Sequence, residues 1–215
     1  MKVGILISGR GSNLKSLIDA CATPGYPAEI ALVISNRPEA PGLGIARAAG
    51  IPALAIDHKL FATREAFDAE LDKALRAAGV ELICNAGFMR ILSDGFVEAW
   101  RDRQLNIHPS LLPAFKGLKV HERVLEAGVR ITGCTVHIVR PAMDEGPIVA
   151  QVAVPVQPGD TAETLADRVL AAEHKLYPLA LKLVAGGHVR LEGERAIIDG
   201  AVAKAQAPLF VPDIS

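Results

Sequence analysis

The sequence predicts an α/β fold: a mostly parallel sheet with helices on both faces, mixed at its later edge. Short runs of β-branched residues alternate with segments whose apolar residues recur at helical spacing. The composition, 50% hydrophobic and 22% charged, is typical of a globular protein, and no linker interrupts the 215 residues. We therefore expect a single domain.

Strands and helices alternate regularly in the first half of the chain. The helical pattern is clearest where Phe67, Leu71 and Leu75 fall on one face. Because parallel strands need crossover connections, this alternation predicts a Rossmann-like sheet. The predicted strands are 3–7, 30–34, 52–56 and 82–86, and the predicted helices are 14–22, 43–49 and 64–78.

The second half continues with predicted strands at 105–108, 134–139 and 149–154, which make the later edge of the sheet mixed. Asp160 and Glu163 form a capping pair for a long helix that ends near Ala185. The segment "HVRLEGERAIID" predicts a hairpin, followed by a loose tail. We expect a domain over residues 1–190, with 191–215, the hairpin and the tail, packed on it.

Charge and cysteine content narrow the class of function. The formal net charge of −1 argues against binding long nucleic acid or an anionic membrane surface, so a small ligand is the better expectation. No apolar run approaches the ~20 residues that span a bilayer, and the N-terminus lacks a signal-peptide pattern. The three cysteines are widely spaced in apolar surroundings, which predicts reduced thiols, no zinc site and a cytoplasmic protein.

The segment "ISGRGSNL" joins the first predicted strand to a helix and could hold a phosphate. Leu14 stands where a dinucleotide fingerprint needs its third glycine, and it also precedes Lys15-Ser16 where a P-loop needs glycine. Two readings remain from the residues. Ser12 and Asn13 either add donors to a compact anion site or merely cap the helix.

A second strand end keeps a reductase open as an alternative. Ser35-Asn36-Arg37 lies where such an enzyme would read an adenosine ribose, and Arg37 suits a 2′-phosphate. An NADP-dependent reductase and a non-catalytic nucleotide-binding module are therefore the rivals from other classes.

The segment "NIHPSLLP" places two polar side chains on one face of an extended chain. Asn106 and His108 alternate with apolar residues, and Pro109 stops the strand. Asp144, in "MDEGP", follows a later strand, and ligand sites of open α/β sheets lie beyond strand ends. If Asp144 reaches His108, its carboxylate favours the protonated imidazole. Taken alone, each residue could equally be structural.

"NIHPSLLP" and "MDEGP" resemble the signature of the 10-formyltetrahydrofolate-dependent formyltransferases. "SGRGSNL", "AGFMRILS" and "AAEHKLYP" extend the resemblance over residues 1 to 190. It implies transfer of a formyl group from 10-formyltetrahydrofolate to the amine of glycinamide ribonucleotide, without a metal. A sugar nucleotide is an alternative amine, and either monomer or homodimer is compatible with the sequence.

The resemblance also assigns residues to roles. Two of them have an independent rationale: Arg64 is a cation in the first turn of its helix, and Glu173 is a carboxylate on an apolar helical stripe, where Arg168 or His174 could pair with it instead. The implied catalytic residues are Asn106, His108 and Asp144. The implied folate-binding residues are Arg64, Met89, Arg90, Ile91, Leu92, Asn106, Arg140, Pro141, Ala142, Met143 and Asp144. The implied ribonucleotide-binding residues are Gly11, Ser12, Asn13, Pro109 and Glu173.

The implied chemistry is direct transfer through a tetrahedral intermediate, with Asn106 and His108 stabilising the oxyanion and His108 moving the proton. No serine or cysteine in the motif stands beside His108 as a nucleophile. Two segments depart from the usual pattern: Asn85 replaces an aliphatic residue, and the loop at 114–121 differs, which could reshape the nucleotide pocket.

Overall fold

The structure, a computed structural model, describes residues 1–200 and residue 211. A seven-stranded sheet has the order β3-β2-β1-β4-β5-β6-β7, and β8 and β9 form a second sheet. The chain divides into two compact units, one of residues 1–106 with 138–142 and one of 107–137 with the described residues from 143 onward. The single domain expected from the sequence stays a prediction.

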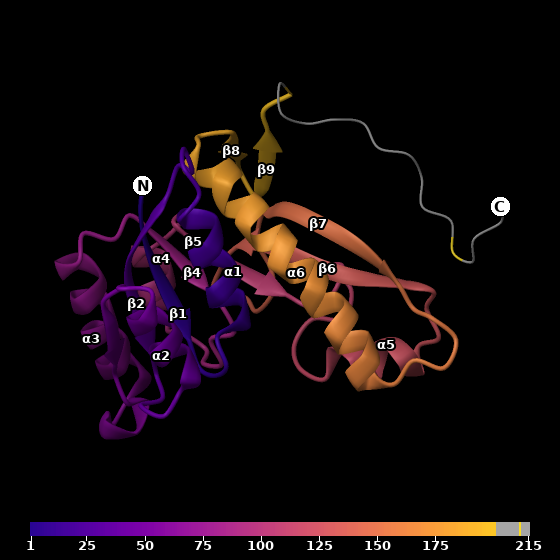
Figure 1. The fold of residues 1–215 in the computed structure, drawn as a ribbon, viewed down its shortest axis with the longest axis horizontal. Coiled ribbons are helices and arrows are strands. Elements are labelled where there is room, and N and C mark those ends of the chain that lie inside the picture. The colour runs from indigo at the N-terminus through magenta and orange to yellow at the C-terminus, as the bar shows by residue number, and fades with distance from the viewer. Residues whose placement is uncertain (201–210, 212–215) are drawn as a thin grey trace. The chain divides into compact units, whose positions relative to one another are not determined.

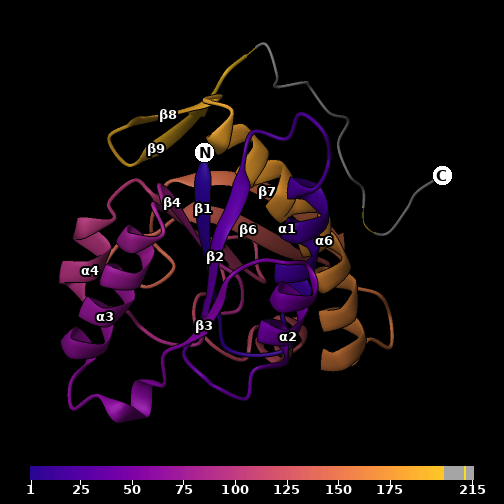
Figure 2. The ribbon, with the colours of Figure 1, turned by 60° about the vertical axis from the view of Figure 1, so that its left-hand side comes forward.

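The first unit contains the parallel part of the sheet. β1 pairs in parallel with both β2 and β4, β2 with β3, and β4 with β5. In Figure 2, α1 and α2 lie on one face of β1 and β2 while α3 and α4 lie on the other. The predicted parallel α/β arrangement is thereby confirmed. Figure 1 labels most of these elements, whose bounds are β1 (Lys2–Ile7), α1 (Ser12–Cys21), β2 (Glu29–Ser35), α2 (Pro41–Ala48), β3 (Ala53–Ala55), the 3₁₀ turn η1 (His58–Leu60), α3 (Arg64–Ala77), β4 (Leu82–Asn85), α4 (Asp94–Ala99) and β5 (Gln104–His108).

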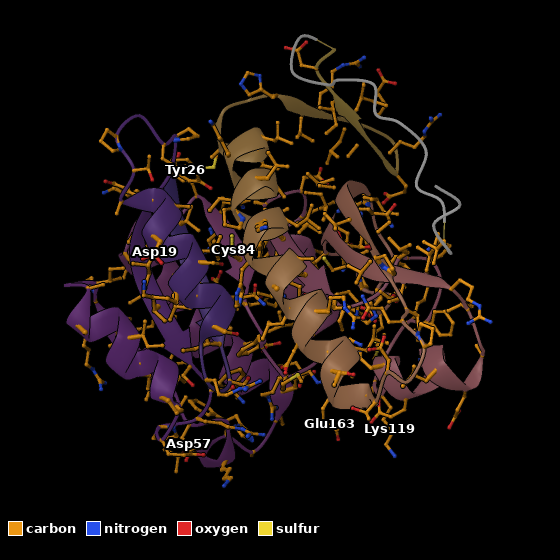
Figure 3. The ribbon with its side chains drawn as sticks, turned by 45° about the vertical axis from the view of Figure 1, so that its right-hand side comes forward. Asp19, Tyr26, Asp57, Cys84, Lys119 and Glu163 are labelled. Carbon is orange, nitrogen blue, oxygen red and sulfur yellow. The ribbon has the colours of Figure 1, made fainter. Side chains whose placement is uncertain are left out.

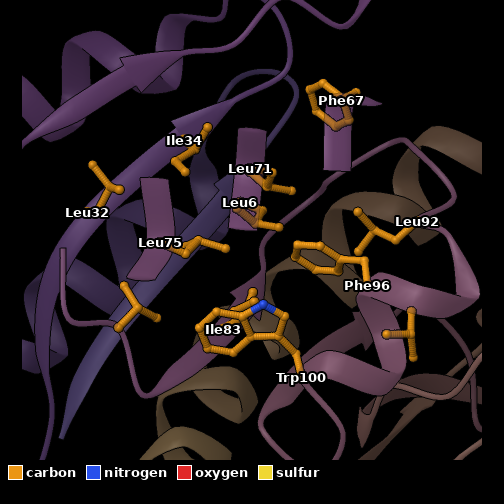
Figure 4. Packing of buried hydrophobic residues seen from close by; sticks show 12 residues of the cluster. Leu6, Leu32, Ile34, Phe67, Leu71, Leu75, Ile83, Leu92, Phe96 and Trp100 are labelled. Carbon is orange, nitrogen blue, oxygen red and sulfur yellow. The ribbon is translucent and has the colours of Figure 1, made fainter. Parts of the chain in front are cut away.

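One hydrophobic cluster of the first unit lies between the sheet and the pair α3 and α4 (Figure 4). Phe67, Leu71 and Leu75, the predicted apolar face of α3, are fully buried there. Trp100 follows α4, is buried, and donates from Nε1 to Asp72 Oδ1 at 2.8 Å. The guanidinium groups of Arg76 and Arg103 lie 5.2 and 4.8 Å from the centre of its ring. α4, a short helix, was not predicted from the sequence.

The second unit carries the antiparallel edge. β6 pairs antiparallel with β7, which confirms the mixed later edge, and β8 pairs with β9 as the predicted hairpin. The helix α6 packs against β7 and against α5, a helix that the sequence did not predict. Lys119 and Glu163 mark the neighbouring ends of α5 and α6 (Figure 3). The bounds are α5 (Val120–Glu126), β6 (Ile131–Ile138), β7 (Ile148–Pro155), α6 (Ala162–Ala185), β8 (Val189–Glu192) and β9 (Arg195–Ile198).

The start of α6 corrects one prediction. Thr161, rather than Asp160, is the N-cap, and it forms a capping box with Thr164 rather than with Glu163. Asp160 instead accepts hydrogen bonds of 2.8 Å from both terminal nitrogens of Arg168. This bidentate pairing holds the pKa of Asp160 well below its ordinary value, with help from the Gln157 N–H.

No helix within residues 1–200 is long and apolar enough to span a membrane. The predicted loose tail lies, apart from residues 200 and 211, outside the described residues.

Candidate functional site

The first unit places two loops at a topological switch point. β1 pairs with β2 on one side and with β4 on the other. The strand order therefore reverses its direction at β1. In open α/β sheets the crevice beyond the strand ends at such a point is the usual ligand site. The segments that follow β1 and β4 are residues 8–11 and 86–93.

Glycine is required at two positions around the first of these loops. Gly11, the N-cap of α1, has φ of 79°, and a Cβ there would lie 2.8 Å from the Cα of Gly42. Gly42 in α2 donates its N–H to the Gly9 carbonyl at 3.1 Å. α2 therefore packs directly against the backbone of the loop, and the space between Gly11 and Gly42 is too small for a side chain.

The loop has the arrangement expected of an anion site. Within the described part of the chain no side chain caps α1, so the capping alternative for Ser12 and Asn13 is wrong. Both residues instead form the first turn of the helix. The N–H groups of a first turn lack partners within the helix, and together with the positive end of the helix dipole they favour a phosphate.

The adjacent strand end is occupied by internal contacts. Ser35 Oγ donates to the Arg37 carbonyl at 2.8 Å, and Ser8 Oγ donates to Asn36 Oδ1 at 2.5 Å. Ser35 and Asn36 are both buried. The side chains of Ser35 and Asn36 are therefore engaged within the protein, whereas the side chain of Arg37 is exposed.

The loop after β4 presents a mixed surface. Met89 and Ile91 are exposed, whereas Leu92 is buried. The Arg90 guanidinium lies 5.1 Å from the centre of the Phe67 ring, a cation–π contact. At the end of β4, Gln104 donates to Asn85 Oδ1 at 3.2 Å, which accounts for the polar residue that departs from the usual pattern.

Two predicted folate residues in the first unit have surroundings that the sequence did not foretell. Arg64 is exposed, unlike Phe67 and Leu71 on the same helix, and lines a cavity of about 560 Å³ between α3 and α4. The other charged groups lining that cavity are carboxylates. Arg140 pairs with Asp102 at 2.7 Å. Asn106 is half-buried in β5, and Pro141 and Ala142 are exposed.

The second unit brings His108 and Asp144 together. His108 Nδ1 lies 3.4 Å from Asp144 Oδ2, with the two side chains 8% and 10% exposed. His108 Nε2 donates to the Phe115 carbonyl at 3.0 Å. Both ring nitrogens of His108 therefore face oxygen atoms of the protein.

A strained loop surrounds this pair. Phe115, Lys119 and Asp144 are non-glycine residues with φ of 54°, 52° and 53°. Gly117 donates its N–H to Asp144 Oδ2 at 2.8 Å, and Lys116 pairs with Glu145 at 2.6 Å. Non-glycine residues in this region cost about 1–2 kcal/mol each, and such strain is concentrated at functional sites.

The remaining predicted residues of the second unit fall into two groups. Glu173 is buried on α6, as the apolar stripe predicted. Burial of Cys134 raises the pKa of that thiol to about 12, and the charge of Glu173 contributes to the same rise. Arg168 is committed to Asp160 rather than to Glu173. Pro109 is half-buried and Met143 exposed.

Several residues that shape the site were not predicted. The Phe115 carbonyl and the Gly117 N–H are backbone groups whose placement depends on loop dihedrals. His121 is half-buried beside them, and burial lowers its pKa while the charge of His108 lowers it further against the opposing effect of Glu122. A histidine two residues beyond "FKGLK" was the available signal, but its placement depends on α5, which was not predicted.

Comparison with known families agrees with this geometry. The family described as formyl transferase matches residues 1–181. A solved structure titled glycinamide ribonucleotide transformylase 1, from Symbiobacterium toebii, superposes with a TM-score of 0.90 at 49% identity, covering 92% of this chain and 93% of that one.

Curated relatives are of two lengths. Phosphoribosylglycinamide formyltransferase of Escherichia coli is 42% identical over 93% of this chain and 94% of its own length. The trifunctional purine biosynthetic protein adenosine-3 of Bos taurus is 55% identical over 88% of this chain, which spans only 19% of that longer protein. The family match over most of the chain, and relatives far above 30% identity, show that the chain belongs to the formyl transferase family.

Proposed function

We propose that the chain transfers the formyl group of 10-formyltetrahydrofolate to the amine of glycinamide ribonucleotide. The observation that carries the proposal is the buried His108–Asp144 pair, 3.4 Å apart, in a member of the formyl transferase family. The choice of substrate follows the names of two relatives, which are 42% and 49% identical to this chain. The products are then formylglycinamide ribonucleotide and tetrahydrofolate, a step of purine synthesis.

The ribonucleotide is assigned to the glycine loop and to α6. Its monoester phosphate suits the first turn of α1, where the Gly11 loop approaches a ligand by its backbone alone. Glu173, a buried carboxylate, is suited to the amine or amide of the substrate. The proposed binding residues are Gly11, Ser12, Asn13, Pro109 and Glu173.

The folate is assigned to the loop after β4 and the segment around Asp144. The exposed side chains of Met89 and Ile91 provide apolar surface, and Arg64 provides a cation for a carboxylate. The proposed binding residues are Arg64, Met89, Arg90, Ile91, Leu92, Asn106, Arg140, Pro141, Ala142, Met143 and Asp144.

The proposed chemistry uses Asn106, His108 and Asp144 without a metal ion. When the amine attacks the formyl carbon, negative charge develops on the formyl oxygen, which the Asn106 amide can stabilise together with the His108 imidazolium, whose Nε2–H must leave the Phe115 carbonyl to reach the substrate. Both lie in β5 at alternate positions, so they leave the strand on the same face. The His108 imidazolium then gives its proton to the departing nitrogen and, as neutral imidazole, takes one from the attacking amine, while Asp144 stabilises the charged form.

The cellular setting belongs to the same proposal. We place the protein in the cytoplasm, acting on small molecules and not on nucleic acid, in keeping with the formal net charge of −1. Gel filtration with light scattering would distinguish a monomer from a homodimer.

The test is a turnover assay with 10-formyltetrahydrofolate and, in parallel, glycinamide ribonucleotide, a sugar-nucleotide amine or water. Formylation of the ribonucleotide with a kcat/KM at least a hundredfold above that of the sugar nucleotide is expected. Preference for the sugar nucleotide, or for water, would contradict the substrate assignment. NADPH titration followed by fluorescence is the control for a reductase.

A further inference from the structure

Two side chains that are not among the proposed substrate-binding residues hold the loop after β4 in place. Ser8 Oγ accepts a hydrogen bond from the Met89 N–H at 2.7 Å. Four residues later, Asp68 Oδ2 accepts one from the Ser93 N–H at 2.6 Å. The loop that carries Arg90, Ile91 and Leu92 is therefore tied at both ends to side chains of the first unit.

Both anchoring side chains are buried. Ser8 is 3% exposed at the end of β1, and Asp68 is 3% exposed on α3. A hydrogen bond shielded from water is stronger than an exposed one, and breaking it leaves a buried group unsatisfied. Burial therefore makes each anchor a firm constraint on the loop backbone.

Ser8 is itself oriented by a second residue. Its hydroxyl donates to Asn36 Oδ1 at 2.5 Å, so that its lone pairs are turned toward Met89. Asn36 is 1% exposed, and its backbone carbonyl oxygen lies 2.8 Å from His58 Nδ1. A shorter contact to a carbonyl indicates that Nδ1 carries the proton, which leaves the 3.2 Å contact with Asn36 Nδ2 as simple packing.

The hydrogen bonds of Ser8 with Asn36 and Met89 connect the residues that follow three strands of the first unit. Ser8 follows β1, Asn36 follows β2, and Met89 follows β4. Ser8 also precedes the glycine loop, whose Gly9 carbonyl is held by Gly42. One hydroxyl thus sets the distance between the loop assigned to the ribonucleotide and the loop assigned to folate.

We propose that Ser8, with Asn36, and Asp68 are positioning residues that hold the Met89–Leu92 loop in its folate-binding conformation without touching either substrate. The proposal rests on the proposed function for its substrate but not for its anchoring contacts. Removing an anchor should allow the loop backbone to move, which weakens binding of the formyl donor more than binding of the ribonucleotide.

The test compares four variants. Ser8→Ala and Asp68→Ala each remove an anchor, and Asp68→Asn keeps an acceptor for the Ser93 N–H. Ser35→Ala is the matched control, because Ser35 is also a buried serine at the end of the neighbouring strand, and its hydroxyl bonds to the Arg37 backbone rather than to the loop after β4.

Ser8→Ala and Asp68→Ala are expected to raise KM for 10-formyltetrahydrofolate about tenfold, the effect of ~1.4 kcal/mol, with KM for the ribonucleotide changed less than threefold. Asp68→Asn and Ser35→Ala should stay within threefold of wild type for both. Equal rises for both substrates, or a rise in Ser35→Ala as large as in Ser8→Ala, would overturn the proposal.

Hydrogen exchange separates failure of the anchors from failure of the proposed function. The Met89 and Ser93 amides should exchange at least tenfold faster in Ser8→Ala and Asp68→Ala, respectively, than in Ser35→Ala. Unchanged exchange would refute the anchors whatever the enzyme does. Faster exchange in a protein whose wild type fails to formylate the ribonucleotide would refute the substrate instead.

Discussion

The glycine loop of the first unit and the His108 loop of the second hold a sharply bent backbone by opposite means. The first uses glycine where φ is positive, at Gly11, and keeps its shape through the close approach of Gly42. The second places Phe115, Lys119 and Asp144 in the same left-handed region and holds them with hydrogen bonds and ion pairs. An anion site made of backbone needs space, whereas a proton-transfer site needs side chains and accepts strain to place them.

The largest effect should come from removing the side chain that the strained loop serves. His108→Ala is expected to lower kcat by about 10²–10⁴, the usual contribution of a general acid or base. Asp144→Asn should lower kcat less, and the double variant should be little worse than His108→Ala because the two act as a unit. Additive losses in single-turnover measurements would show that the carboxylate acts elsewhere.

The second effect tests the space around the glycine loop. Gly42→Ala would put a Cβ 2.6 Å from Ile7 Cδ1 and 3.2 Å from the Gly9 oxygen. Overpacking of this kind costs about 1–3 kcal/mol, and it should raise KM for the ribonucleotide through the displaced loop.

Gly44→Ala in the same helix is the control, since no atom lies within 4 Å of its added Cβ. It should stabilise the protein by up to about 1 kcal/mol through helix propensity. Urea denaturation that ranks the two variants in the reverse order would break the comparison.

The third effect is smaller and tests the strain. Lys119, at φ of 52°, precedes α5, so Lys119→Gly should relieve about 1–2 kcal/mol while adding about 0.4–1 kcal/mol of unfolded-state freedom. The net expectation is a gain of about 0–1.6 kcal/mol in the free energy of unfolding.

Lys73→Gly, in the helical interior of α3, is the counterpart without strain and should lose about 1 kcal/mol. Should both lysine variants lose the same free energy, the left-handed residues of the His108 loop would not be strained.

The smallest effect concerns pH. Burial lowers the pKa of His121 and of His174 below the ordinary 6.5, so the unfolded chain takes up protons before the folded one does. Stability from these residues is therefore complete above pH 6.5 and falls as the pH drops through that value toward the folded pKa. The variant His121→Gln/His174→Gln should lose less stability than wild type between pH 8 and pH 5.5 in urea titrations.

These two regions also differ in how far the sequence could predict them. The turn at Gly11 was recognised because glycine spacing is local, and the strands and α1, α2, α3 and α6 followed from periodicity. That the first turn of α1 is free of a side-chain cap is also a local property, although the sequence left it open.

The surroundings of His108 were not accessible in this way. The contact between His108 and Asp144 could be stated only as a condition, since it joins residues 36 positions apart across a loop whose positive φ values belong to residues that seldom adopt them. The Thr161 cap and the Ser8–Met89 bond depend on which of several nearby polar groups wins a partner, which tertiary packing decides.

Trp100 gives the first unit an optical signal of its own. It is the only tryptophan of the chain, and its indole is buried, hydrogen-bonded to Asp72 and flanked by two guanidinium groups. Its emission should therefore shift to the red when residues around α3 and α4 unfold and should be silent to changes confined to the second unit. Unfolding curves from fluorescence and from far-ultraviolet circular dichroism will coincide only if both units lose their structure together.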